Sequence, residues 1–173
     1  MSYSVYAYLT DAQKVASVYG SKNQKTFQDL SNSLKEELSD LDSDFQEDTD
    51  DKKNAVEVLR DIVDGTIRFP DISFMYGYVY EKICEYFGRE IYVSERIWEL
   101  EEQSAFIPIP FSEDFPYIIS ISKNQLKEKK EKFLSLEEGE GIGDYDYEEE
   151  IDDLTFIFDE AIEKSKDLVI FVC

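Results

Sequence analysis

The residues that could do chemistry in this sequence are carboxylates and tyrosines, because histidine is absent. The chain has 173 residues, among them 40 Asp and Glu, 12 Tyr, 2 Cys and no His. Without imidazole, the chain can form neither a Ser-His-Asp or Cys-His nucleophile nor a His-based zinc or iron site. Two cysteines cannot supply a Cys₄ zinc site. Any general base would be Asp, Glu, Lys, Tyr or Cys.

The most distinctive aromatic cluster is Tyr76-Gly77-Tyr78-x-Tyr80. On a helix, Tyr76 and Tyr80 share a face and Tyr78 points elsewhere. One interpretation makes these tyrosines core and half-buried side chains. The other makes all three, together with Trp98, part of a binding groove, since aromatic anchors often dominate interfaces. Gly77 lowers helix stability by about 1 kcal/mol relative to Ala, and it would allow another backbone to approach closely.

Known metal and nucleotide motifs are not completed. Asp40-x-Asp42-x-Asp44 resembles the opening of a calcium loop, but the sixth position is Phe45, where the loop needs Gly. The glycines of Gly139-x-Gly141-x-Gly143 do not have dinucleotide-binding spacing, and acidic residues flank them. The sequence therefore predicts no metal site and no cofactor, and it identifies no catalytic residue.

Charge is strongly negative and unevenly distributed. The net charge of −22 disfavours nucleic acid and anionic membranes as partners. Glu36–Asp51 holds nine acids and Glu137–Asp153 holds ten, with no base in either run, whereas Lys123–Lys132 holds five lysines. We expect the lysines to lie near one acidic run and partly neutralise it. The runs are interpreted either as solvated surface or as a docking surface for a basic protein.

Composition indicates a globular protein. Apolar residues make up 42% and aromatic residues 14% of the chain, which is unlike disordered acidic sequences. The length favours a single domain over residues 1–173. No signal-peptide pattern is present, and no apolar run approaches the ~20 residues of a membrane helix. With only two cysteines, a cytoplasmic location is expected.

Hydropathy patterns predict an α/β fold, with α+β as an alternative. Strands are expected at Tyr3–Leu9, Tyr117–Ile121 and Leu168–Val172, all in one small mixed sheet. A helix-dominated arrangement with only two paired strands is the other alternative. Three prolines make Ala105–Pro116 an extended crossing segment. Ile91–Leu100 begins like a strand and is otherwise ambiguous.

Helices are predicted from apolar spacing and from capping residues. Phe and Leu at intervals of three and four predict one helix over Thr26–Phe45, and further helices are expected over Asn54–Val63 and Phe74–Phe87. These three should form a layer against the sheet. Capping boxes predict two more helices, one from Thr10-x-x-Gln13 to about Val18 and one from Ser122-x-x-Gln125 to about Leu134. A last helix is expected over Glu148–Lys164.

Several segments together resemble a known family. They are S-Y-S-V-Y-A-Y-L near the start, Y-G-S-K at Tyr19–Lys22, Y-G-Y-x-Y-E-K-I-C at Tyr76–Cys84, F-x-x-D-F-P at Phe111–Pro116, and F-D-E-A-I-E-K-S-K-D-L-V-I-F at Phe158–Phe171. The chain resembles an uncharacterised bacterial family of unknown function, acidic and cytosolic. It is also similar to YfbM-like domains in its first strand and in its last helix and strand. No segment is a catalytic motif, so the resemblance implies a fold and no activity.

Three function hypotheses remain open at this point. The first is a non-enzymatic protein-binding module, for example an immunity-like or inhibitory protein that masks a basic partner. The second is a small-molecule-binding or hydrolytic protein that uses Asp, Glu and Tyr, which predicts a pocket with convergent carboxylates of raised pKa. The third is a nucleic-acid mimic that presents carboxylates at phosphate-like spacing.

Overall fold

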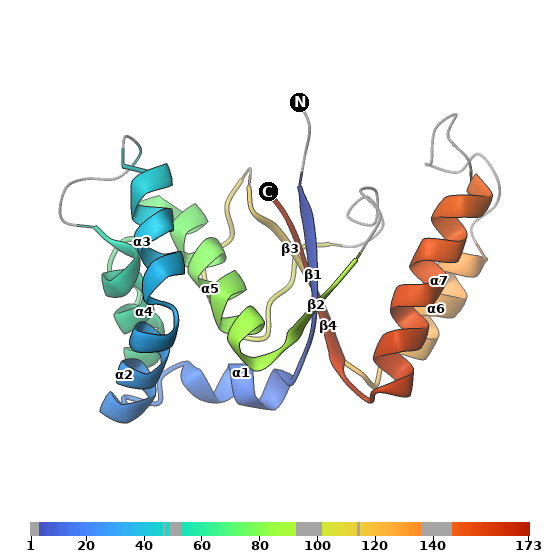
Figure 1. Ribbon diagram of the computed structural model, residues 1–173, viewed down its shortest axis with the longest axis horizontal. Coiled ribbons are helices and arrows are strands. Elements are labelled where there is room, and N and C mark those ends of the chain that lie inside the picture. The colour runs from blue at the N-terminus through green and yellow to red at the C-terminus, as the bar shows by residue number, and fades with distance from the viewer. Residues whose placement is uncertain (1–3, 47, 49–52, 93–101, 114, 136–146) are drawn as a thin grey trace.

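The computed structural model describes residues 4–46, 48, 53–92, 102–113, 115–135 and 147–173 (Figure 1). These residues form an α/β fold in which helices surround a four-stranded sheet of order β2-β1-β4-β3. The strands are β1 (Val5–Thr10), β2 (Arg89–Ile91), β3 (Tyr117–Ile121) and β4 (Asp167–Val172). The helices are α1 (Ala12–Val18), α2 (Gln24–Ser33), α3 (Lys35–Asp44), α4 (Ala55–Asp64), the 3₁₀ helix η1 (Pro70–Ile72), α5 (Ser73–Phe87), α6 (Leu126–Leu134) and α7 (Tyr147–Glu163).

The three predicted strands share one sheet, which confirms the expected arrangement. β4 is central, because Ile170 pairs with Ala7 of β1 on one side and with Ile119 of β3 on the other. All the described pairings are antiparallel, so the expectation of a mixed sheet is wrong. The reason is that two helices, α6 and α7, lie side by side between β3 and β4 and return the chain to the end of the sheet that it left (Figure 1).

The alternation of side chains along the strands gives the sheet two apolar faces. On one face, Ala7, Leu9 and Ile170 pack with Phe133 of α6 and Phe158 of α7. The other face carries residues such as Tyr8 and Phe171, and it packs against α1 and α5. The sheet therefore lies between two helical layers (Figure 1).

The predicted helical layer against the sheet is only partly correct. Of the three helices expected there, α5 packs against β1, whereas α2, α3 and α4 pack on the outer side of α5 (Figure 1). α5 can contact both because its buried residues, such as Met75, Tyr80 and Cys84, cover most of its circumference. The stripe of α5 that is partly exposed is formed by Phe74, Tyr78, Lys82 and Glu85.

The single helix predicted over Thr26–Phe45 is instead two helices, α2 and α3. They are separated at Leu34, whose φ of −102° and ψ of 20° lie outside the helical range. The leucine stripe continues through the break, since Leu30, Leu34, Leu38 and Leu41 are all buried. The apolar spacing is satisfied in both arrangements, so it does not reveal the bend.

Helix starts differ from the expectation at α1 and at α6. α6 begins at Leu126, and its N-cap is Gln125, without a side-chain capping hydrogen bond, rather than the predicted Ser122. α1 begins after Asp11, whose Oδ1 accepts hydrogen bonds from the backbone nitrogens of Gln13 and Lys14 at 3.1 and 3.2 Å. Thr10 is not the cap, because it still pairs with Asp167 at the end of β1. α4 begins with a complete capping box between Asn54 and Glu57.

The described residues of the proline-containing segment form neither a helix nor a strand, as the prolines predict, and the segment bends at Phe106 and Ile107 rather than being extended throughout. Ile107 and Ile109 are buried in the core, and the backbone nitrogen of Ser104 donates to the carbonyl of Ile118 at 2.8 Å. No helix in the described part of the chain is long and apolar enough to cross a membrane.

Candidate functional site

A pocket of about 380 Å³ opens where the C-terminal end of α3 meets the first turns of α5 and the segment that leads into β3. This volume lies near the lower end of the range for small-molecule pockets, about 300–1,000 Å³. We call it the aromatic pocket, because four of its six lining residues are aromatic. The lining residues are Phe45, Asp48, Phe74, Tyr78, Ser112 and Phe115.

Three of the rings are positioned by helix geometry. Phe45 is the C-cap of α3 and ends its apolar stripe, while Phe74 and Tyr78 are four residues apart on α5 and share a face. The Phe45 ring centroid lies 5.2 Å from that of Phe74 and 4.9 Å from that of Tyr78. These separations are typical of favourable aromatic pairs. Phe45 therefore joins α3 to α5 beside the pocket.

The far wall comes from the segment before β3, and Gly77 determines how closely it approaches. A Cβ atom at Gly77 would lie 2.5 Å from Cγ of Pro116, which is closer than van der Waals contact permits. The sequence suggested close approach of a backbone at Gly77, and the neighbour is in fact the ring of Pro116. The Gln103 side-chain amide also donates to the Ser112 carbonyl at 3.2 Å, which holds the other end of this wall.

Exposed carboxylates follow α3 to the pocket. Glu36, Asp40, Asp44 and Asp48 are four residues apart and exposed, and we call them the acidic row. Among the residues that the structure describes, none of their carboxylates accepts a hydrogen bond or forms an ion pair. The last turn of α3 holds no basic residue. Since the C-terminal end of a helix carries partial negative charge, the pocket lies at a strongly negative position.

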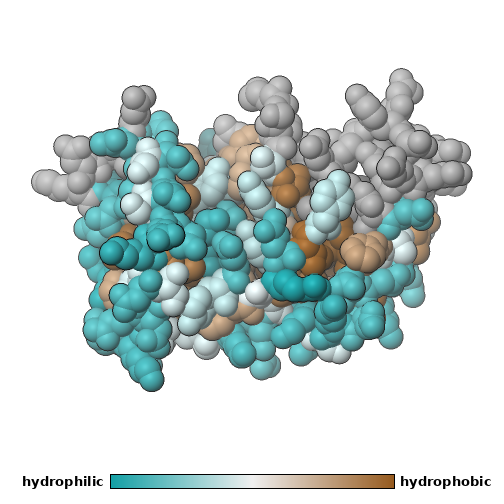
Figure 2. Space-filling view, viewed as in Figure 1, coloured by the Kyte–Doolittle hydropathy of each residue, from teal (hydrophilic) through white to brown (hydrophobic). Residues whose placement is uncertain are grey.

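The surface around α3 is mainly hydrophilic. Figure 2 shows mainly hydrophilic residues over α2 and α3, with hydrophobic surface gathered nearer the middle of the molecule. The backbone nitrogen of Asp48 donates to the carbonyl of Phe45 at 3.0 Å, which holds the backbone of the row's last member close to the end of α3.

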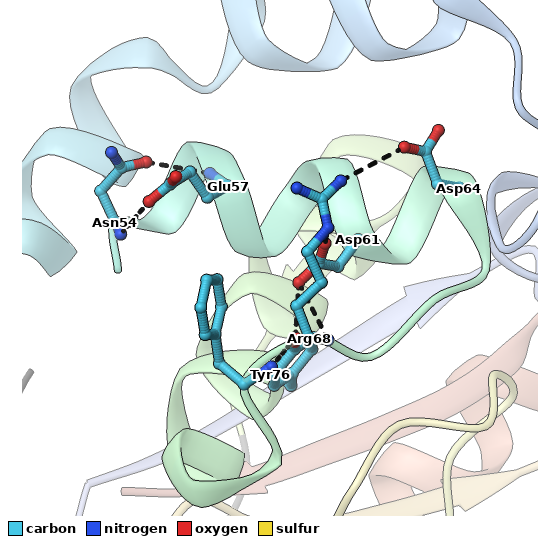
Figure 3. A network of polar contacts seen from close by, with 7 residues as sticks. Asn54, Glu57, Asp61, Asp64, Arg68 and Tyr76 are labelled. Carbon is cyan, nitrogen blue, oxygen red and sulfur yellow. Dashed lines mark hydrogen bonds and ion pairs between the residues drawn. The ribbon is translucent and has the colours of Figure 1, made fainter. Parts of the chain in front are cut away.

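Tyr76 lies in a buried polar network between α4 and α5 (Figure 3). Its hydroxyl donates to Oδ2 of Asp61 at 2.7 Å, and Nε of Arg68 lies 2.6 Å from Oδ1 of the same carboxylate. Asp61 is fully buried, whereas the side chain of Arg68 is half exposed. Burial, and then the hydrogen bond to Asp61, raise the pKa of Tyr76 to about 12. The network thus compensates a buried carboxylate and links two helices.

Tyr80 is also a core residue. Its hydroxyl accepts a hydrogen bond from the backbone nitrogen of Phe106 at 3.0 Å and lies 3.4 Å from Oγ of Ser120. Burial raises the pKa of Tyr80 well above its usual value. The position of Tyr80 is explained by its attachment of the proline-containing segment to α5.

Carboxyls of raised pKa occur, but not at the pocket. Burial raises the pKa of Glu81, which accepts hydrogen bonds from the Tyr8 hydroxyl at 2.8 Å and the Lys82 ammonium at 3.1 Å. Burial also raises the pKa of Asp42, which accepts a hydrogen bond from the Ala55 backbone nitrogen. Neither is among the described lining residues of the aromatic pocket, so the convergent carboxylates of raised pKa expected of a hydrolytic site are not found in that lining.

The cysteines do not offer an alternative nucleophile. Burial raises the pKa of both thiols, that of Cys173 to about 12. Both thiols are therefore protonated near neutral pH, and the thiolate is the reactive form. Within the described ranges, no three His, Cys, Asp or Glu side chains lie close enough to hold a metal ion.

The four predicted binding residues are thus in different environments. Tyr78 lines the aromatic pocket, Tyr76 and Tyr80 are fully buried, and Trp98 lies outside the described residues. A binding role for Tyr78 stays a prediction. Sequence reasoning did not identify Phe45 as a pocket residue, because it ends a leucine stripe. The sequence signal that could have pointed to this site is the four-residue spacing of the acids in the acidic row, which leads from Glu36 to Asp48.

One comparison with known proteins gives a match. A family model described as "Domain of unknown function (DUF7691)" matches residues 1–173. The chain belongs to this family. The expectation of an uncharacterised family is therefore confirmed. No curated protein matches the chain, and no solved structure matches it.

Proposed function

We propose that the protein is a non-enzymatic protein-binding module that docks a basic partner through the acidic row and the aromatic pocket. The observation that carries the proposal is the continuity of these two features along α3 and beyond its end. Exposed acids steer a basic protein toward the surface, and partly buried aromatic residues give it an anchoring point. An immunity-like or inhibitory role, in which a basic partner is masked, fits this surface.

The acidic row weakens the free protein, which favours a role in binding. Like charges four residues apart on a helix destabilise it by about 0.2–0.5 kcal/mol for each pair. Glu36, Asp40 and Asp44 form two such pairs within α3. A net charge of −22 adds general self-repulsion. A basic partner would relieve both effects.

Among the described residues, the lysine-rich helix α6 packs against α7 and not against the acidic row on α3. α6 lies beside α7, which begins within the second acidic run, and Nζ of Lys130 lies 2.6 Å from Oδ1 of Asp159. Asp159 lies outside the second acidic run, so the expected neutralisation of an acidic run by these lysines stays a prediction. The acidic row on α3 has no equivalent basic helix packed beside it in the described part of the chain.

The proposal also includes the location and extent of the protein. We propose a cytoplasmic location, which is supported by the two unpaired cysteines. We propose one domain over residues 1–173, which is supported by the sheet that both apolar clusters share. The similarity to YfbM-like domains and a bacterial source also stay proposals.

The test compares how well wild-type protein and a variant of the acidic row capture a partner protein. The variant combines Glu36→Gln, Asp40→Asn and Asp44→Asn. Capture is compared at roughly 0.05 M and 0.5 M salt, between which the Debye length falls from above 10 Å to about 4 Å. We expect a basic protein that wild type binds at low salt, that high salt releases, and that the variant binds at least about tenfold more weakly.

A matched control separates the row from overall charge. The control combines Glu128→Gln, Glu131→Gln and Glu163→Gln, three exposed acids of α6 and α7, and it changes the net charge equally. The control should bind within about threefold of wild type. Equal losses in the two variants, or no basic protein retained at low salt, would contradict the proposal.

A further inference from the structure

We propose that the aromatic pocket accepts an alkylammonium group, the end of a lysine side chain on the partner. This inference rests on the proposed function, because it names the group that the partner inserts. It adds a specific chemical preference to a surface that would otherwise attract any positive charge.

The aromatic residues are the first reason. Phe45, Phe74, Tyr78 and Phe115 surround a volume of about 380 Å³. A cation within about 6 Å of a ring centroid is attracted to the electron-rich face, and groups of aromatic rings are the usual receptors for substituted ammonium groups. The rings can also cover the methylene groups of a lysine side chain, which bury well against apolar surface.

The charges around the pocket are the second reason. Asp48 is one of the lining residues, and Phe45 is the C-cap of α3. The negative end of the helix dipole therefore acts in the same direction as Asp48. Asp42 and Asp44 occupy the last turn of α3, where a cation would be favourable and an acid is not. A neutral apolar guest would gain from the rings alone.

The described lining suits a cationic side chain, and guanidinium is the competing guest, because arginine also stacks on aromatic rings. An arginine side chain gains most from two parallel hydrogen bonds to a carboxylate, with its plane fixed. Among the lining residues that the structure describes, Asp48 is the acidic one, and it stands beside four aromatic residues. An ammonium group acts as a compact point charge and needs no such planar partner.

The experiment uses small probes on the full chain, so it does not require the partner. Nα-acetyl-lysine N-methylamide is titrated into isotope-labelled protein, and nuclear magnetic resonance follows the aromatic rings and the amide of Phe45. The matched probe is the norleucine analogue, which has the aliphatic chain without the ammonium. We expect the lysine probe to bind at least roughly fivefold more tightly than the norleucine probe.

Two variants test the two reasons separately. Asp48→Asn changes an exposed side chain and should weaken lysine-probe binding by roughly 3- to 10-fold, without weakening norleucine-probe binding. Phe74→Leu keeps an apolar side chain but removes a ring, and it should also selectively weaken lysine-probe binding. Glu163→Gln, on α7, is the control and should change neither. Circular dichroism checks folding, and Asp48→Asn remains informative if Phe74→Leu does not fold.

The outcomes are distinguishable from those of the capture experiment. Equal binding of the norleucine probe, equal binding of the corresponding arginine probe, or no saturable change at the pocket each overturns the alkylammonium proposal, even if a basic partner is captured. Selective lysine-probe binding that Asp48→Asn weakens supports it. If that result occurs and no basic protein is captured, the proposed function fails while the pocket preference stands.

Discussion

Replacement of Tyr76 by Phe tests the energetic role of the buried network between α4 and α5 (Figure 3). The change removes one oxygen from a fully buried position. That oxygen donates to Asp61 at 2.7 Å and accepts from the backbone nitrogens of Arg68 and Phe69 at 3.2 and 3.3 Å. Tyr76→Phe therefore leaves part of a buried carboxylate and two backbone groups less well compensated.

The magnitude follows from the charge and burial of Asp61. A hydrogen bond to a charged group contributes about 1.5–3 kcal/mol, and a buried group left unsatisfied loses a similar amount. Asp61 keeps its ion pair with Arg68, which limits the loss. We expect Tyr76→Phe to lower the free energy of unfolding by roughly 2–3 kcal/mol. For a chain of this size, Tm would then fall by about 4–12 °C.

The assay is denaturant unfolding followed by circular dichroism, together with a thermal melt. Tyr86→Phe is the matched control, because Tyr86 is on the same helix and its side chain is 42% exposed. The control should stay within about 0.5 kcal/mol of wild type. A double-mutant cycle of Tyr76→Phe with Asp61→Asn should give a coupling energy of about 1–2 kcal/mol. If Tyr76→Phe also stays within about 0.5 kcal/mol of wild type, the network does not contribute as we describe.

Three further predictions concern other buried positions. Burial raises the pKa of Glu81 above its ordinary value of 4.5. The stability that protonated Glu81 contributes is therefore complete below about pH 4.5, and it is lost as the pH rises through the raised pKa of the folded state. In urea unfolding, the free energy of unfolding of Glu81→Gln relative to that of wild type should therefore increase as the pH rises above about 5, and a pH-independent difference would refute this. Gly77→Ala should destabilise by about 1–2 kcal/mol in a thermal melt, since overlap with Pro116 exceeds the gain in helix propensity, and stabilisation would contradict the packing described. Asp167→Asn should reduce the free energy of unfolding by about 1–2 kcal/mol, because the two Asp167 oxygens each accept a backbone N–H at 2.8 Å, from Ala12 and Lys123, and unchanged stability would show that these bonds are dispensable.

Much of the secondary structure could be predicted because the signals are local. Tyr117–Ile121 was predicted with the bounds that β3 has, because a short run of β-branched and aromatic residues lies between Pro116 and the polar residues that begin at Ser122. The start of α4 was predictable from Asn54 and the stop from Gly65, whose φ is +70°. Such features depend on residues only a few positions apart.

The features that could not be predicted depend on distant contacts. The bend at Leu34 preserves the leucine stripe, so periodicity is the same with or without it. Nothing local indicates that α6 and α7 cover the opposite face of the sheet from α5. The aromatic pocket needs Phe115 to approach Phe45, and in the sequence Phe45 has the spacing of an ordinary core residue. Tyr78 could be identified because it is on a different helix face from Tyr76 and Tyr80.

The central claim is that the acidic row and the aromatic pocket form the contact surface for a basic protein. The most direct measurement is amide chemical-shift mapping on the isotope-labelled full chain as the captured partner is added. We expect the largest chemical-shift changes at the amides of α3, of the first turns of α5, and of residues 112, 113 and 115. Changes confined to α6 and α7, with the amides of α3 unaffected, would contradict it.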